Sequence, residues 1–305
     1  MEKIEGLIAA PFTPMDEQGE LALHQVETLA RLYDRNDIAG AFVCGSTGEG
    51  VSLTYEEKVQ LMHAWGAAKG ERIKTIFLLG GTCLKEMQSL ARLAAPAGMD
   101  AVAALCPYYF RPNSVEKLVD FCREVASAAP DLPFYYYHIP ALSGGHFSMA
   151  RFLAIAEPLI PNLAGIKFTS TDIMDFHACR MYGDQRYDIL WGVDEALLSG
   201  LAAGATGAVG STYNYAAPLY HRIVAAFRAG DNREAEQWQQ LAVRMVGYLV
   251  QYGGTAAGKA FMKIIGVDCG WFRPPVGGIP TTAVAALARD LETIGFFDFC
   301  SLTKP

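Results

Sequence analysis

The sequence has no concentration of positive charge. Its 25 Lys and Arg residues are outnumbered by 32 Asp and Glu residues, which gives a formal net charge of −7. No cluster of Lys and Arg alternates with aromatic residues in the way that a surface following a phosphate backbone requires. These absences argue against nucleic acid as a partner.

Metal-binding and redox motifs are also missing. The six histidines are scattered, and the seven cysteines are odd in number, far apart and without a C-x-x-C pair. Neither a Gly-Lys-Ser/Thr phosphate loop nor a G-x-G-x-x-G dinucleotide motif is present. We therefore expect no metal site, and we expect the reduced thiols of a cytosolic protein.

Long hydrophobic runs are absent as well. The first residues, MEKIEGLIAAPFTPM, hold only a short apolar run interrupted by prolines, which is not the pattern of a secretory signal. No later segment reaches the apolar length of a membrane span. We expect a cytoplasmic protein that is not associated with a membrane.

Short apolar runs bounded by Gly, Pro or polar residues are the main feature of the first two thirds of the chain. The eight runs cover residues 6–12, 40–45, 75–81, 101–107, 133–140, 164–169, 187–192 and 204–211. Segments with helical spacing separate them, and each run is too apolar to have a solvated face, which favours a parallel sheet covered by helices. Eight such units predict an α/β protein with a (β/α)8 TIM barrel rather than a doubly wound open sheet.

The rest of the chain is predicted to be helical. We expect a catalytic barrel over residues 1–229 and a C-terminal helical extension over residues 230–305 that packs on the barrel. The Pro- and Gly-rich segment of residues 267–280 contains Trp271 and Phe272, which need burial against the barrel or a neighbouring subunit.

Catalytic groups of this architecture lie at the carboxyl ends of the strands, where one lysine is unusual. Lys167 is the only lysine inside an apolar run, between Ile166 and Phe168. A desolvated lysine loses proton affinity and becomes a nucleophile near neutral pH. The alternative is a structural lysine paired with a carboxylate, but no Asp or Glu lies in the neighbouring runs before Asp194 and Glu195.

Two other segments offer groups for the same site. In Gly45-Ser46-Thr47-Gly48-Glu49-Gly50 the glycines can turn backbone N–H groups inward, and two hydroxyls add donors for a carboxylate, although an ordinary surface turn has the same composition. In the Tyr135-Tyr136-Tyr137 run the first and third share one face, so Tyr137 can point into the barrel mouth and relay protons, or simply pack.

The last two runs end in polar residues that suit a polyhydroxylated ligand. Asp194 and Glu195 follow the seventh run, and Ser211 and Thr212 follow the eighth. Asp194 also precedes a helical segment and can cap it. We expect capping and ligand binding to coexist.

Four of these motifs carry a resemblance to a known family. GSTGEG, YYYHIPALSG, GIKFTSTD and GVDEALLSGLAAGATGAVGSTYNY resemble the N-acetylneuraminate lyases, members of the pyruvate-dependent aldolase superfamily that also includes dihydrodipicolinate synthase. The resemblance covers nearly the whole chain. The YYYHIP form, with His138 where the common bacterial enzymes have Asn, is more similar to the animal lyases.

The resemblance implies a class I aldolase in which Lys167 forms an imine with the substrate's keto carbon. Tyr137 would shuttle protons, and Ser46 and Thr47 would hold the substrate carboxylate. The positions that contact the sugar portion in the family are Thr169, Gly192, Asp194, Glu195 and Ser211. Because the imine accepts the electrons, no cofactor is required.

Two further positions separate the relatives. Leu142, which the resemblance implies is a substrate-binding position, is what the sialic acid lyases have where dihydrodipicolinate synthase has an arginine for a second acidic group. Tyr109 matches a tyrosine that the synthases lend across a dimer interface, and family members are usually homotetramers built as a dimer of dimers. The alternatives are a 2-keto-3-deoxy sugar acid aldolase, a synthase-like enzyme and a catalytically silent sugar-acid sensor.

Overall fold

Eight parallel strands close into a barrel in the computed structural model, which describes residues 3–301 and 303. Each strand pairs with the next along the chain, and β8 pairs with β1 through Gly207 and Gly6. The strands are β1 Gly6–Ala9, β2 Gly40–Val43, β3 Lys74–Leu78, β4 Ala101–Leu105, β5 Phe134–His138, β6 Leu163–Phe168, β7 Asp188–Trp191 and β8 Gly207–Gly210. All eight predicted runs overlap these strands, and the (β/α)8 prediction is confirmed.

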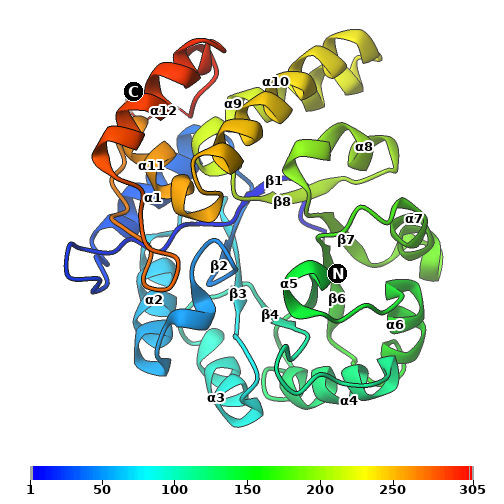
Figure 1. Cartoon of the computed structure of the whole chain (residues 1–305). Helices are drawn as coiled ribbons and strands as arrows, with labels where there is room; N and C mark the ends of the chain where they lie inside the picture. Colours follow the sequence, from blue (N-terminus) through cyan, green and yellow to red (C-terminus); the bar gives the residue numbers. More distant parts are fainter. Residues whose placement is uncertain (1–2, 302, 304–305) are drawn as a thin grey trace.

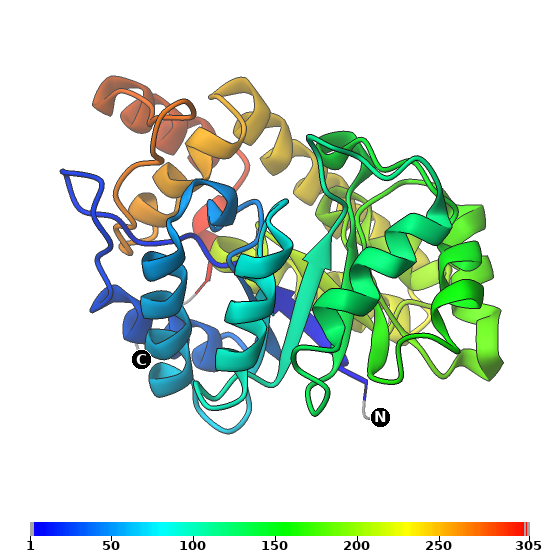
Figure 2. The ribbon, with the colours of Figure 1, turned by 90° about the horizontal axis from the view of Figure 1, so that it is seen from below.

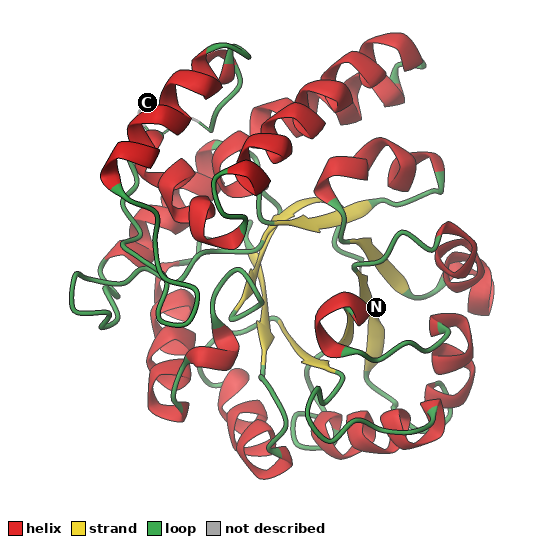
Figure 3. Cartoon of the chain, viewed as in Figure 1, coloured by secondary structure: helices red, strands yellow, loops and turns green. Residues whose placement is uncertain are grey.

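Helices surround the barrel, as the red ring around the yellow strands in Figure 3 shows. The α-helices are α1 Gln25–Arg35, α2 Tyr55–Ala68, α3 Leu84–Ala94, α4 Val115–Ala126, α5 Pro140–Ser143, α6 Met149–Ala156, α7 Ile173–Met181, α8 Leu197–Ala202, α9 Tyr213–Arg228, α10 Asn232–Gln251, α11 Thr255–Ile264 and α12 Thr281–Glu292. The short 3-10 helices are η1 Gly50–Ser52, η2 Tyr182–Gln185, η3 Asp194–Ala196 and η4 Phe296–Asp298.

Local sequence signals explain where helices begin. Thr54 and Glu57 form a capping box at α2, in which the Glu57 N–H donates to Thr54 Oγ1 at 3.2 Å and the Thr54 N–H donates to Glu57 Oε2 at 2.8 Å. Ser114 and Ser148 accept hydrogen bonds from the first turns of α4 and α6. These caps fix where each helix starts relative to the strand that precedes it.

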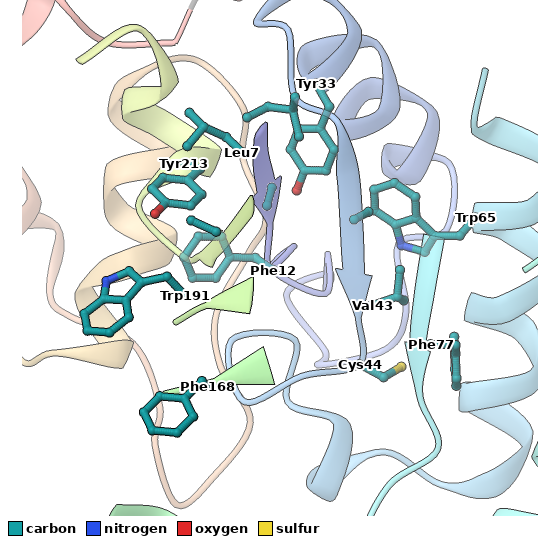
Figure 4. Close-up of a cluster of buried hydrophobic side chains, with 14 of the residues drawn as sticks. Leu7, Phe12, Tyr33, Val43, Cys44, Trp65, Phe77, Phe168, Trp191 and Tyr213 are labelled. Atoms are coloured by element: carbon teal, nitrogen blue, oxygen red, sulfur yellow. The ribbon is translucent and has the colours of Figure 1, made fainter. Parts of the chain in front are cut away.

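The core has two layers separated by the strands. Inside the barrel, side chains such as Ile8, Phe42 and Tyr137 form one buried cluster. A larger cluster lies between strands and helices, and Figure 4 shows part of it, including Tyr33 and Trp65. The rings of these two residues stack, with centroids 5.7 Å apart. Successive residues of one strand alternate between these layers, which decides which side chains face the barrel axis.

The C-terminal helices α10, α11 and α12 gather at one side of the barrel (Figure 1). Figure 2, turned by 90°, places these yellow to red helices toward the end to which the strand arrows point. Helix α10 joins the barrel at η3, where the Gln239 amide donates to the Glu195 carbonyl at 2.9 Å. The division into a barrel of residues 1–229 and an extension of residues 230–305 stays a prediction.

Only one of the two aromatic residues of the 267–280 segment is buried. Phe272 is buried and meets Phe12 edge to face, with centroids 6.0 Å apart. Trp271 is 44% exposed in the single chain, so it is not buried against the barrel, and its burial against a neighbouring subunit stays a prediction. No helix within residues 3–301 has both the length and the apolar character needed to cross a bilayer.

Candidate active site

Lys167 lies inside the barrel among apolar groups. Its side chain comes from β6 and is paired in register with Tyr137 of β5. The Lys167 Nζ atom lies 4.0 Å from the ring centroid of Phe42 and 4.0 Å from that of Tyr137, and the residue is 4% exposed. The amine is therefore enclosed by two aromatic rings and shielded from bulk water.

Burial changes the protonation of this amine. Desolvation lowers the pKa of Lys167 to about 7, and the Asp194 carboxylate opposes part of that shift. Within the described residues, 3–301 and 303, no carboxylate oxygen lies within 4.0 Å of the Lys167 Nζ atom. The alternative of a structural lysine held in an ion pair is thus wrong, and a substantial fraction of the amine is neutral near pH 7.

The three tyrosines of β5 alternate as the sequence predicts. Tyr135 and Tyr137 belong to the cluster inside the barrel, whereas Tyr136 packs outside against Phe152. The Tyr135 hydroxyl donates to Asp188 Oδ2 at 2.9 Å, while the Tyr137 hydroxyl lies 3.5 Å from Ser46 Oγ. Burial raises the pKa of Tyr137, so its phenol is neutral and can both donate and accept a proton.

The loop that follows β2 is a tight turn. The N–H groups of Gly48 and Gly50 donate to the Gly45 carbonyl, and that of Glu49 donates to Ser46. A Cβ atom at Gly50 would lie 1.9 Å from the Cys44 carbonyl oxygen, so only glycine fits there. These three N–H groups close the turn and are not donors to a ligand, whereas Ser46 and Thr47 line the cavity. The anion site of this loop stays a prediction.

Asp194 is buried and bonded to the neighbouring loop. Its Oδ2 atom accepts from the Thr212 N–H at 2.9 Å and from the Thr212 hydroxyl at 2.7 Å. Desolvation raises the pKa of this carboxyl to about 6, and the two bonds from Thr212 oppose the shift. The prediction that Asp194 caps the next helix is wrong, because the carboxylate ties the end of β7 to the end of β8 instead.

A cavity of about 730 Å³ opens above these groups, which is a usual size for a small-molecule site. Seven residues predicted to hold the substrate's carboxylate or its sugar portion line this cavity: Ser46, Thr47, Thr169, Gly192, Asp194, Glu195 and Ser211. Leu142 is not among the lining residues. Lys167 and Tyr137 lie beneath this lining, and the Tyr137 hydroxyl approaches it through Ser46. The sequence therefore located residues that five different strand ends bring together.

Other lining residues were not predicted. They are Phe12, Pro140, Ala141, His146, Ser170, Thr171, Val193, Tyr215, Val246, Leu249, Val250, Gly254, Thr255 and Gly258, whereas Thr212 was expected at the site together with Ser211. Val246, Leu249 and Val250 come from α10, where an apolar helical stripe is read as core packing. No sequence signal separates such a stripe from a cavity wall.

Leu142 and Tyr109 lie away from the cavity lining in the single chain. Leu142 is on α5 and is 67% exposed, whereas its neighbours Pro140 and Ala141 supply the contact with the cavity. This geometry does not support direct contact between Leu142 and a ligand. Tyr109 is 78% exposed, and its role toward a second subunit stays a prediction.

Comparison with known proteins identifies the family. The model of the dihydrodipicolinate synthetase family matches residues 3–294. The chain belongs to this family. Within the family it is 37% identical to the N-acetylneuraminate lyase of Rattus norvegicus over 306 residues, covering 99% of this chain and 96% of that protein.

Solved structures of sialic acid lyases have the same fold as this chain. The N-acetylneuraminate lyase of Proteus mirabilis matches with a TM-score of 0.94 and 37% identity, covering 97% of this chain and all of that one. A catalytic lysine mutant of the Ruminococcus gnavus sialic acid aldolase matches with a TM-score of 0.89 and 25% identity over 97% and 98% of the two chains. The resemblance to the animal lyases is confirmed, and it extends to a bacterial lyase at the same identity.

Proposed function

We propose that this protein is a class I aldolase that cleaves N-acetylneuraminate to N-acetylmannosamine and pyruvate. The observation that carries the proposal is the buried amine of Lys167, with a pKa of about 7, beneath a cavity lined by hydroxyls and carboxylates. The names of the relatives support the same activity, and one of them has a catalytic lysine. Such an enzyme is a carbon–carbon lyase.

The first half of the proposed reaction forms an imine. Ser46 and Thr47 hold the carboxylate of open-chain N-acetylneuraminate at the cavity floor. The neutral amine of Lys167 attacks the keto carbon C2, and the resulting carbinolamine loses water to give a protonated imine. The Tyr137 phenol, next to both the amine and Ser46, carries the protons that these steps exchange.

The second half breaks the C3–C4 bond. In the first half, Tyr137 gives its proton to the hydroxyl that leaves the carbinolamine as water and becomes a phenolate. The phenolate then takes the proton of the C4 hydroxyl, and the electrons of the C3–C4 bond move to the imine, which becomes an enamine. The aldehyde of N-acetylmannosamine leaves, Tyr137 passes its proton to C3, and water hydrolyses the imine to pyruvate and free Lys167 as the phenolate takes a proton back. The imine is the electron acceptor throughout, so the proposal requires no metal or organic cofactor.

The sugar portion is proposed to lie against Thr169, Gly192, Asp194, Glu195 and Ser211. All five line the cavity beside the loop of Ser46. A Cβ atom at Gly192 would come within 2.1 Å of Thr169 Oγ1, so only glycine leaves room for that hydroxyl. Carboxylates and hydroxyls on separate loops suit several sugar hydroxyls at once.

We also propose a cytoplasmic homotetramer arranged as a dimer of dimers. Tyr109 and Phe110 are 78% and 84% exposed and stand next to each other, with centroids 5.1 Å apart. Two large exposed aromatic rings favour burial against a second subunit. Light scattering of the purified protein would give four times the mass of the 33.1 kDa chain.

The proposed activity is tested by product analysis. Purified protein is incubated separately with N-acetylneuraminate and with 2-keto-3-deoxygluconate, and pyruvate and the released aldehyde are quantified. We expect N-acetylmannosamine and pyruvate in equal amounts and much slower turnover of the second substrate. Faster cleavage of 2-keto-3-deoxygluconate would favour the sugar acid aldolase, and binding without turnover would favour the sensor.

The pH dependence follows from the protonation of Lys167. Because only the neutral amine attacks a ketone, the rate of imine formation should fall about ten-fold per pH unit below the pKa and level off above it. With a pKa of about 7, the midpoint is expected near neutral pH. Trapping the pyruvate imine at timed intervals between pH 5 and pH 9 measures it, and a midpoint near pH 10 would contradict the assigned pKa.

Replacing Asp194 should move that midpoint. The Asp194 carboxylate raises the pKa of Lys167, so Asp194→Asn is expected to shift the imine-formation midpoint to lower pH. Pyruvate is the reactant of choice because it lacks the sugar portion that Asp194 is proposed to bind. The matched control is Glu195→Gln, which removes an adjacent exposed carboxylate and should leave the midpoint in place. Equal shifts in both variants would contradict a specific role for Asp194.

A further inference from the structure

The loop that carries Ser46 and Thr47 has an unfavourable backbone conformation at both ends. Cys44 has φ 58° and Glu49 has φ 56°, in the left-handed region that favours glycine. Non-glycine residues keep such angles only where surrounding contacts impose them, and they concentrate at functional sites. The conformation of this loop therefore depends on contacts made by its end residues, such as Glu49.

Glu49 is bonded by two groups from the C-terminal extension. Its Oε1 atom accepts from Lys259 Nζ of α11 at 2.7 Å, and its Oε2 atom accepts from the Arg273 N–H at 2.8 Å. Lys259 Nζ also donates to the Trp271 carbonyl at 2.8 Å. The side chains of Glu49 and Lys259 are 4% and 2% exposed, so both charges are enclosed.

The segment that meets Glu49 is itself fixed to the barrel. The Arg273 guanidinium pairs with Glu57 of α2, and its Nε atom donates to the Gly19 carbonyl at 2.8 Å. The Thr13 hydroxyl, which follows β1, donates to the Gly48 carbonyl at 2.6 Å. The two residues directly after Thr47 are thus each bonded to a segment outside the loop.

A contribution to stability alone does not explain a buried ion pair, because desolvation of both charges offsets much of their attraction. The location of this pair indicates a role at the site. Glu49 is two residues after Thr47 and three after Ser46, and the rest of the loop is turned tightly by Gly48 and Gly50. A shift of the Glu49 carboxylate would move both hydroxyls toward or away from Lys167.

We propose that Glu49 and Lys259 are positioning residues that fix Ser46 and Thr47 at the distance from Lys167 needed to hold the substrate carboxylate. The C-terminal extension is then a part of the carboxylate site and not only a cover for the barrel. This inference rests on the proposed function, since it takes the carboxylate of a 2-keto acid as the ligand of Ser46 and Thr47.

The test uses a double variant, Glu49→Gln with Lys259→Met. Removing both partners leaves no unpaired buried charge, so the fold is less disturbed than by either single change. The matched control is Lys69→Met with Asp100→Asn, a partly buried ion pair that precedes β3 and β4 at the amino ends of the strands. The thermal midpoint of each protein reports the structural effect of losing a pair.

Two binding measurements separate positioning from general damage. The half-saturating concentration of pyruvate is measured by borohydride trapping on Lys167, and that of N-acetylmannosamine by condensation at saturating pyruvate. In the Glu49→Gln/Lys259→Met protein we expect the pyruvate value to rise about ten-fold or more, since small displacements of positioning groups are costly. The N-acetylmannosamine value should stay within about two-fold of the parent, and the control pair should leave both values unchanged.

Three results are decisive. An unchanged pyruvate value in the double variant, with the parent protein labelled normally, would overturn the positioning role while leaving the proposed function intact. Equal increases for pyruvate and N-acetylmannosamine would also overturn it, because they would show a general loss of site structure. Absence of any adduct in the parent protein would overturn the proposed function and, with it, the inference that rests on it.

Discussion

Replacing Lys167 with methionine is expected to reduce kcat for N-acetylneuraminate cleavage at least about 10⁴-fold, because no other group can form the imine. Methionine matches the length of the lysine side chain and suits the apolar surroundings formed by Phe42 and Tyr137. A coupled assay for pyruvate release measures the effect.

The Lys167→Met variant should lose activity without losing stability. Burial disfavours the charged amine of Lys167, so its removal is expected to leave the thermal midpoint equal to or above that of the parent. Scanning calorimetry of the two proteins at pH 7 provides the comparison. A variant that retains a tenth or more of the parental activity would contradict the assignment of Lys167 as nucleophile, because a loss of about ten-fold or less is far smaller than the loss expected.

Replacing Tyr137 with phenylalanine is expected to lower kcat by about 10²–10⁴-fold, the usual contribution of a positioned proton-transfer group. The ring would keep its contacts with Phe42 and Lys167, so the change removes only the hydroxyl that lies 3.5 Å from Ser46 Oγ. Steady-state kinetics should show a smaller change in KM than in kcat.

Tyr135 supplies the matched control for this change. It lies in the same strand and the same interior cluster, but its hydroxyl donates to Asp188 at 2.9 Å, away from the cavity lining. Tyr135→Phe should reduce stability by about 1–3 kcal/mol through the lost bond to a carboxylate and leave kcat nearly unchanged. Equal kinetic losses in both variants would show that Tyr137 acts only through packing.

Much of the fold could be predicted because a barrel repeats one pattern. Each apolar run is buried on both faces, and the helices between runs carry local start signals such as the Thr54 and Glu57 box. The strand ends then coincide with the cavity rim, which is why Lys167 could be expected near the site from its position in a run, whereas the role of Asp194 came from the family resemblance.

The sequence could not predict contacts between distant segments. Asp194 looks like a helix cap locally, but its bonds to Thr212 depend on the pairing of β7 with β8. Glu49 and Lys259 are 210 residues apart, and nothing in either segment indicates that they meet. The cavity wall formed by α10 could not be predicted either, because core packing and ligand binding require the same apolar stripe on a helix.

Exposure was the other property that sequence reasoning missed. Leu142 was placed among the substrate-binding positions by the family resemblance, yet α5 turns it outward to 67% exposure. Trp271 was expected to be buried against the barrel or a neighbouring subunit, yet within the chain only Phe272 of the pair packs inward. Both differences concern which of two adjacent side chains faces the protein, and short irregular segments offer no periodicity to decide it.

The central claim is that the amine of Lys167 condenses with a 2-keto acid. The most direct measurement is to treat the parent protein with pyruvate and borohydride, digest it, and locate the added mass by mass spectrometry. We predict a single reduced pyruvate adduct on the peptide containing Lys167, formed with a pH midpoint near neutrality. An adduct on another lysine, or no adduct at saturating pyruvate, would contradict the proposed mechanism.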